Sequence, residues 1–174
     1  MIETVTQLKR LRALVRSWKK EGKRIALVPT MGNLHEGHYT LVRQARRHAD
    51  KVVASVFVNP TQFGPNEDFD RYPRTPEADV AGLMDAGCEV AWMPSVAQMY
   101  PLGVELTTRV SVQGTVTAVL EGASRPGHFD GVCTVVSRLF NQVTPDVALF
   151  GKKDYQQLAV IRQLVAELQF PLEI

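Results

Sequence analysis

The stretch that decides the fold is IALVPTMGNLHEGH, residues 25–38. It opens on a short apolar run that Pro29 ends, which is typical of a buried strand. A polar turn with two glycines follows, and then residues 41–49, whose apolar side chains repeat on one face between arginines, as in a helix. Residues 52–58 form a second continuous apolar run. A strand, a helix and a strand within about 35 residues predict a βαβ unit.

The same alternation continues on both sides of this unit. Periodic apolar residues predict helices at 8–18, 76–86, 132–143 and 158–168, and apolar runs predict strands at 88–93 and 146–150. Weaker patterns predict an edge strand or hairpin arm at 105–112 and the start of a strand at 170–174. Thr4 or Thr6 is the expected cap of the first helix, and Gly22 its expected end. Strands that alternate with helices predict an α/β fold, a parallel sheet with helices on both faces.

The composition is that of a single globular domain. The chain has 174 residues, of which 45% are hydrophobic and 22% charged. A net charge of +2 is too balanced to imply a nucleic-acid or membrane surface. No apolar run approaches the length of a membrane-spanning helix, and the N-terminus has no signal-peptide pattern. Cys88 and Cys133 are far apart between apolar residues, which predicts reduced, buried thiols in a cytoplasmic protein.

Three polar segments fall at the carboxyl ends of predicted strands, where parallel sheets bind their ligands. These segments are residues 29–38, 59–64 and 151–154. Residues 59–76, which contain four prolines, and residues 121–131 are predicted to be irregular loops, and such loops are often functional. The sequence contains no P-loop and no G-x-G-x-x-G, so a nucleotide would be held here by other means.

The first polar segment suits a phosphate. His35 and His38 are three residues apart and can share one face of the first helical turn. A helix start offers free N–H groups and a positive dipole end, and Gly32 and Gly37 let an anion approach the backbone. The interpretation is a nucleoside-triphosphate site. Solvated loop histidines are the plainer alternative, and zinc is disfavoured because an H-E-x-x-H site needs i, i+4 spacing.

The other segments are less specific. In Gly151–Asp154, Asp154 is a plausible N-cap and Lys153 could reach a phosphate, although a solvated turn explains the tetrapeptide alone. The Asn59 and Gln62 amides could fix a hydroxyl or carboxylate, or belong to a simple turn. Arg125–His128 could close over an anion or form a surface loop. From the residues themselves, the prediction is an α/β domain with a phosphate site built on two histidines and one lysine.

Five runs together resemble one family over nearly the whole chain. They are PTMGNLHEGH, FVNPTQF, RYPRT, EGASRPGHFDGV and FGKKDYQQL, in the order and spacing of the pantothenate synthetase (pantoate–β-alanine ligase) family. The resemblance implies a Rossmann-like, nucleotidyltransferase-like domain of the H-x-G-H type. It also implies ligation of (R)-pantoate and β-alanine with ATP and Mg²⁺ through a pantoyl-adenylate, with release of AMP and pyrophosphate. Members of the family are typically cytoplasmic homodimers.

The resemblance also implies roles for single residues. His35, His38 and Lys153 would be catalytic, with His38 the general acid. The ATP-binding residues would be Met31, Gly32, Asn33, Leu34, His35, Glu36, Gly37, His38, Gly151, Lys152, Lys153 and Asp154. The pantoate site would comprise Gln62 and Gln157, an apolar wall of Pro29, Met31 and Phe57, and the further positions Asn59, Tyr72 and Arg125. Asp79 and Glu121 match other loop positions, and no residue is assigned as a metal ligand.

Some positions depart from the family pattern. Lys152 stands where the family more often has Glu, and Ala78 replaces a frequent acid, which weakens a metal site near Asp79. The family continues beyond Ile174 with a second domain, so residues 1–174 are expected to be the N-terminal nucleotide- and pantoate-binding domain, which would bind pantoate but be weakly active or inactive. The alternatives are a nucleotidyltransferase of the same fold and a non-catalytic pantoate- or nucleotide-binding domain.

Overall fold

The computed structural model describes the backbone of residues 1–174 and every side chain except those of Thr115 and Val116. Within it, five parallel strands form one sheet in the order β1-β4-β3-β2-β5. The strands are β1 (Glu3–Val5), β2 (Ile25–Thr30), β3 (Lys51–Val56), β4 (Val90–Trp92) and β5 (Val147–Ala148). The predicted parallel α/β sheet is therefore confirmed. The order reverses beside β2, and this is the point at which open α/β sheets bind ligands.

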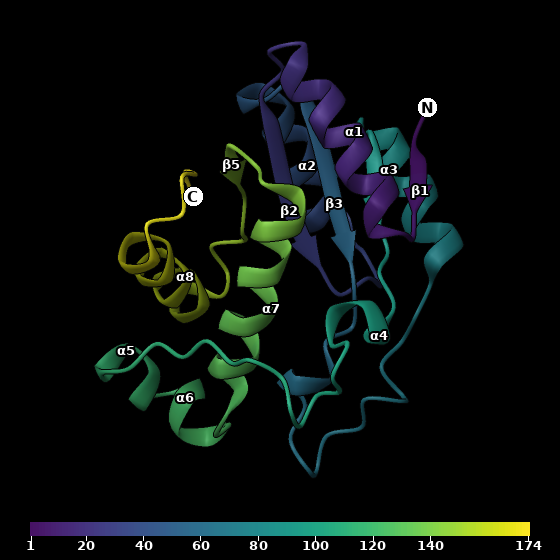
Figure 1. The fold of residues 1–174 in the computed structure, drawn as a ribbon. Coiled ribbons are helices and arrows are strands. Elements are labelled where there is room, and N and C mark those ends of the chain that lie inside the picture. The colour runs from purple at the N-terminus through teal and green to yellow at the C-terminus, as the bar shows by residue number, and fades with distance from the viewer.

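Helices cover both faces of the sheet, as predicted (Figure 1). The long helices are α1 (Leu8–Lys20), α2 (Glu36–His48), α3 (Pro76–Ala86), α7 (His128–Val143) and α8 (Tyr155–Leu168). The short ones are η1 (Pro60–Gln62), α4 (Val96–Met99), α5 (Thr115–Ala118) and α6 (Glu121–Ser124). Along β2, Ile25 and Leu27 pack into the core shared with α1, α7 and α8, whereas Ala26 and Val28 pack into the core beside α2 and α3. This alternation explains why β2 is apolar throughout.

The N-terminal prediction was wrong in one respect. Thr4 and Thr6 do not cap α1, because residues 3–5 form β1, which pairs with β4, and Gln7 is the N-cap. A three-residue strand is too short to show periodicity, and only its partner makes it a strand. Gly22, with φ +73°, does follow the end of α1 as predicted.

Three further segments differ from the predicted secondary structure, at residues 105–112, 121–131 and 170–174. Residues 105–112 form no strand, because side chains of α7 hold this segment: Arg138 bonds the Thr108 carbonyl, and Thr134 accepts from the Val110 amide. Residues 121–131 are not wholly irregular, since they contain α6 and the start of α7. The expected strand at 170–174 is reduced to a single parallel bridge between Val147 and Glu173.

The buried thiols are confirmed. Cys88 and Cys133 are free and buried, and burial raises the pKa of the two thiols to about 12 and about 11. In the part of the chain that the structure describes, no helix is long and apolar enough to cross a membrane.

Candidate functional site

A cavity of about 210 Å³ opens at the carboxyl end of β2, beneath the loop that follows β3. It gathers nine of the residues singled out from the sequence: Pro29, Met31, Gly32, His38, Phe57, Asn59, Tyr72, Gln62 and Gln157. These residues come from segments that lie far apart in the chain. Figure 1 shows why they meet, since the loops that follow β2 and β3 both lie beyond the same end of the sheet. Polar and apolar side chains therefore line the same cavity.

The turn that joins β2 to α2 is held by one buried carboxylate. Gly32 and Asn33 both have positive φ, +82° and +51°, and their turn brings two successive amides toward α3. Asp79, which is 2% exposed, accepts from the N–H groups of Asn33 and Leu34 at 3.0 and 2.9 Å, and from the Thr75 hydroxyl at 3.0 Å. The bond from Asn33 joins residues 46 positions apart in the chain and fixes where α2 begins. Asp79 is therefore a structural anchor of the turn.

The two histidines cap the start of α2 reciprocally. His35 is the N-cap, and its Nδ1 accepts from the Gly37 amide at 3.0 Å, while Nδ1 of His38 accepts from the His35 amide at 3.1 Å. Their ring centroids are 4.2 Å apart, so both rings do lie on one face of the first turn. Because Nδ1 is an acceptor in each ring, each neutral imidazole carries its proton on Nε2. The turn therefore offers two further N–H donors beside the positive end of a helix.

His38 lies in surroundings that favour its neutral form. It is half-buried in the cavity wall, whereas His35 is exposed. Burial lowers the pKa of His38 below its ordinary value, and the neighbouring His35 lowers it further, against a smaller opposite effect of Asp79. A neutral His38 remains a hydrogen-bond donor through Nε2.

A buried network fixes the direction of the Gln62 amide. Asn59 is 1% exposed, and its Nδ2 donates to the Gly131 carbonyl at 3.1 Å and to Gln62 Oε1 at 2.9 Å. Its Oδ1 accepts from the Tyr100 hydroxyl at 2.6 Å and from the Thr61 amide at 3.3 Å. A backbone amide can only donate and a carbonyl can only accept, so the Asn59 amide cannot be reversed. Gln62 Oε1 is thereby used, and Nε2 is the group that Gln62 offers to a ligand.

In this structure the polar groups of Asn59 and Arg125 contact other protein groups. Asn59 lines the cavity, but its amide is occupied by protein groups. Arg125 does not line the cavity; its guanidinium pairs with Glu67 at 2.6 Å and donates to the Gln62 carbonyl at 3.2 Å. Nδ1 of His128 lies 3.3 Å from the same carbonyl. Two side chains of the 121–131 segment thus contact the backbone carbonyl of Gln62 and help to fix its position.

The remaining wall is apolar and was missed in the sequence analysis. Val132, Val135, Val136 and Leu139 of α7 line the cavity, together with Thr30 and Phe150. From the sequence, these residues are predicted only as the periodic apolar positions of a helix at 132–143. Twelve residues of this helix are buried, a band wider than one face of a helix, so α7 both packs in the core and lines the cavity.

The second strand-to-helix turn does not line this cavity, although Phe150 before it and Gln157 after it do. Gly151, Lys152, Lys153 and Asp154 are all exposed, and none of them lines it. Asp154 is the N-cap of α8, as predicted, because its carboxylate accepts from the Gln157 amide at 3.1 Å. That bond sets the first turn of α8, from which Gln157 reaches the cavity. Asn33, Leu34 and Glu36 also lie outside the cavity lining.

Comparison with known proteins places this geometry in a family. The family profile described as pantoate-beta-alanine ligase matches residues 3–174. Pantothenate synthetase from Xanthomonas campestris pv. campestris (strain B100) is 72% identical over 174 residues, which are 100% of this chain and 61% of that protein. The enzyme of the same name from Stenotrophomonas maltophilia (strain R551-3) is 71% identical over 100% of this chain and 62% of its own length. The chain thus spans about three fifths of these relatives.

Solved structures agree with the sequence comparison. Pantothenate synthetase from Thermus thermophilus superposes with a TM-score of 0.92 and 53% identity, covering 99% of this chain and 60% of that one. A pantoate-beta-alanine ligase from Francisella tularensis, solved with beta-gamma ATP and beta-alanine, has a TM-score of 0.93 and 37% identity, covering 100% of this chain and 66% of that one. The sequence, the fold and the placement of the H-x-G-H turn lead to one conclusion: the chain belongs to the pantoate-β-alanine ligase family.

Proposed function

We propose that this chain forms the pantoate- and phosphate-binding part of a pantoate–β-alanine ligase, which joins (R)-pantoate to β-alanine at the expense of ATP. The observation that carries the proposal is the cavity at the end of β2. It places an amide with a fixed donor direction, Gln62, opposite an apolar wall, beside a helix start with two histidine donors. The complexed Francisella relative supports ATP and β-alanine as the other substrates.

Pantoate matches the chemistry of the cavity. It carries a carboxylate and two hydroxyls at its polar ends and a gem-dimethyl group between them. Gln62 Nε2 and the Gln157 amide would serve the oxygens, whereas Pro29, Met31 and Phe57 would pack against the methyl groups. Because buried polar groups cost free energy when they lack a partner, the two amides favour a ligand with oxygens at those points.

The start of α2 would bind the phosphates of ATP. Its dipole and the Nε2–H groups of His35 and His38 favour negative charge, whereas the amides of Asn33, Leu34, His35 and Gly37 already have partners in the protein. A pantoate carboxylate oxygen then attacks the α-phosphorus, the bond to the bridging oxygen breaks, and pyrophosphate leaves. The β-alanine amine next attacks the acyl carbon, AMP leaves with the electrons of the acyl–oxygen bond, and the amine gives up a proton. Lys153, at the exposed 151–154 turn, would neutralise the departing pyrophosphate.

The Mg²⁺ that the family resemblance implies does not fit a side-chain cage in this chain. Among the described residues, no group of three or more His, Cys, Asp or Glu side chains could hold a metal ion. Asp79, whose carboxylate contacts the 31–34 turn, already accepts from two amides and a hydroxyl. In ATP sites Mg²⁺ is held largely by phosphates and water. We therefore assign no step to the metal.

The proposal also includes the location and the oligomeric state of the whole protein. A cytoplasmic location is supported by two free, buried thiols. A homodimer is supported by the strandless 101–113 segment, on which Leu102 and Leu106 are 72% and 80% exposed. Light scattering of the purified chain tests the dimer, and a monomer at all concentrations would contradict it.

Calorimetric titration with pantoate tests the proposed function. We expect the chain to bind pantoate, Gln62→Glu to weaken binding by about tenfold or more, and the exposed Gln44→Glu on α2 to bind like the parent chain. Equal binding by Gln62→Glu would contradict the assignment. A product assay separates the alternatives: a ligase yields AMP and pyrophosphate, a nucleotidyltransferase yields pyrophosphate and a nucleotide-linked product, and a binding domain yields neither. We expect activity from this chain alone to be weak or absent.

A further inference from the structure

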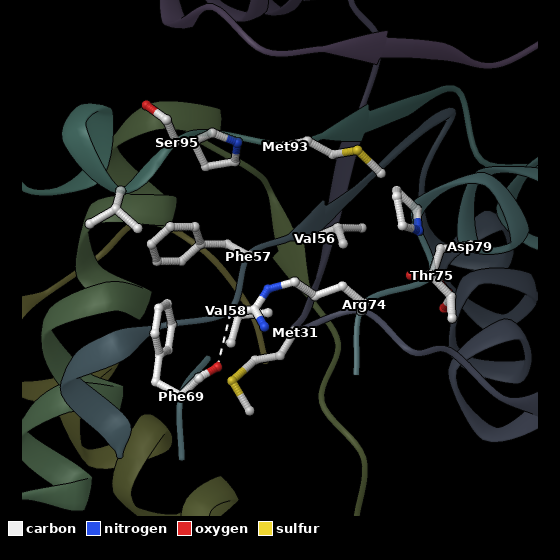
Figure 2. A pocket seen from close by; sticks show the side chains of 14 residues that line it. Met31, Val56, Phe57, Val58, Phe69, Arg74, Thr75, Asp79, Met93 and Ser95 are labelled. Carbon is white, nitrogen blue, oxygen red and sulfur yellow. Dashed lines mark hydrogen bonds between the residues drawn. The ribbon is translucent and has the colours of Figure 1, made fainter. Parts of the chain in front are cut away.

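A second, larger cavity lies on the other side of the 31–34 turn. Its volume is about 370 Å³, and it is bounded by the ends of β3 and β4, the start of α3 and the loop before it. It shares Met31, Gly32 and Phe57 with the first cavity but contains neither glutamine and neither histidine of the proposed site. Figure 2 shows side chains from these separate segments converging on one space.

The wall of this cavity is mostly apolar. Its apolar side chains include Val56, Val58, Phe69, Met93, Pro94 and Val96. A cavity of this kind at the carboxyl end of two parallel strands is a usual place for a small ligand. The shape and lining alone would admit any small apolar molecule, so the polar groups decide the class of ligand.

Arg74, one of the lining residues, has a positively charged side chain that uses only some of its hydrogen-bond donors. The Arg74 side chain reaches across the cavity toward Val58 (Figure 2). Its guanidinium donates to the carbonyls of Asp70, Tyr72 and Phe69 at 3.2, 2.7 and 3.1 Å, and lies 4.9 Å from the centre of the Phe69 ring. A guanidinium has five N–H donors. The Nε–H and one Nη2–H therefore have no partner among the described residues.

Each of the other polar side chains of the wall has at least one partner within the protein. Asp79 accepts three hydrogen bonds, one of them from the Thr75 hydroxyl. The Ser95 hydroxyl accepts from the Gln98 backbone amide at 3.2 Å, and its own O–H is an uncharged donor. Arg74 is thus the group that would select a ligand, and it selects for an acceptor that carries negative charge. A carboxylate on a compact apolar body satisfies both the guanidinium and the wall.

We propose that this cavity binds a small apolar monocarboxylate, with its carboxylate on Arg74 and its hydrocarbon part against β3 and β4. The site goes beyond the ligase function proposed above, because it contains neither glutamine amide that would serve the hydroxyls of pantoate. An occupant would touch the far side of Met31 and Gly32, the residues that separate it from the first cavity. Its binding can therefore be tested without reference to ligase activity.

The test uses hexanoate as the probe and hexan-1-ol as its uncharged counterpart, each titrated into the ¹³C-methyl-methionine-labelled chain. We expect hexanoate to shift the Met93 methyl resonance with a Kd of about 1 mM, and hexan-1-ol to bind at least about fivefold more weakly. Equal affinity for the two probes would overturn the role of Arg74. Absence of a Met93 shift with hexanoate would overturn the site.

Two matched tryptophan variants locate the probe. Val58→Trp fills the cavity and is expected to weaken hexanoate binding by about tenfold or more, whereas Leu106→Trp, at an exposed position outside it, is expected to leave binding unchanged. Unchanged binding by folded Val58→Trp would refute the proposal. If Val58→Trp does not fold, pantoate competition decides: displacement of hexanoate by pantoate places the probe in the first cavity and refutes the proposal, and independent binding supports it.

Discussion

Replacing Asn59 by aspartate should reverse the Gln62 amide. The substitution keeps the shape of the side chain but exchanges the Nδ2 donor for a carboxylate oxygen. That oxygen would face the Gly131 carbonyl and Gln62 Oε1, which now lie 3.1 and 2.9 Å from Nδ2. Gln62 can relieve the repulsion by turning its own NH₂ toward the new carboxylate. Its carbonyl oxygen would then face the cavity and repel the carboxylate of pantoate.

The expected cost in stability follows from the contacts of Asn59. Two hydrogen bonds are lost at a site that is 1% exposed, and the Gly131 carbonyl is left against a negative charge. At 0.5–1.5 kcal/mol for each bond and a further penalty for the unpaired buried carbonyl, the free energy of unfolding should fall by roughly 2–4 kcal/mol. Reversal of Gln62 recovers one bond, so the result should lie toward the lower end of this range. The bonds that Oδ1 accepts from Tyr100 and Thr61 are retained.

The variant should also acquire a pH dependence of known sign. Burial favours the protonated form of the new carboxyl, so its pKa in the folded chain is raised above the unfolded value. The protonated group can donate to the Gly131 carbonyl. The stability difference from the parent chain should therefore be smaller at low pH and should widen as the pH rises through the folded pKa.

Urea unfolding and pantoate titration measure both effects. The exposed Asn66→Asp controls for the added charge and should change the free energy of unfolding by less than about 0.5 kcal/mol. Pantoate binding to Asn59→Asp should weaken by about tenfold or more. Two results would contradict the predicted reversal of the Gln62 amide. One is a folded variant that binds pantoate as the parent chain does, and the other is a loss of stability no larger than that of the control.

Three other predictions rest on separate contacts. Gly37→Ala should lower the free energy of unfolding in urea by about 0.5–2 kcal/mol, because the new Cβ would lie 2.8 Å from Cε1 of His35 and displace the capping ring; an unchanged midpoint would contradict it. Because the pKa of His38 is lowered in the folded chain, stability should fall as the pH drops through 6.5, and His38→Asn should remove that part of the urea–pH profile. Cys88 and Cys133 should not react with Ellman's reagent until the chain unfolds, since both are buried with raised pKa values; labelling of the native chain would refute this.

The sheet could be predicted because its signals are local. Apolar runs mark β2 and β3, and the helix between them carries its own periodic stripe. The helix at 76–86 was predicted with its observed bounds, because Pro76 begins it and Gly87 ends it. By contrast, β1 is a strand only through its pairing with β4, a contact that no local pattern announces. Short elements whose identity depends on a distant partner were therefore missed or misplaced.

The residue types that line the cavity could be predicted from the sequence, but the direction of each polar group could not. Asn59 and Gln62 are both amides in one turn, and the resemblance to the family implies a ligand contact for both. The structure assigns them different tasks, because one side chain is buried in a closed network and the other has a free end. Arg125, for which the sequence allows either closure over an anion or a place in a surface loop, pairs with Glu67. Such distinctions depend on which atom faces which neighbour, and a sequence does not contain that information.

A common construction explains why this site would select oxygen anions. Three side chains of the site have one polar end fixed by a group that cannot reverse its role: backbone amides hold Nδ1 of His35 and His38, and Asn59, itself locked by backbone groups, holds the oxygen of Gln62. In these three side chains the end that remains free is an N–H. The backbone therefore sets the polarity of the site before any substrate arrives, and a preorganised set of donors need not reorient when charge develops on the phosphate.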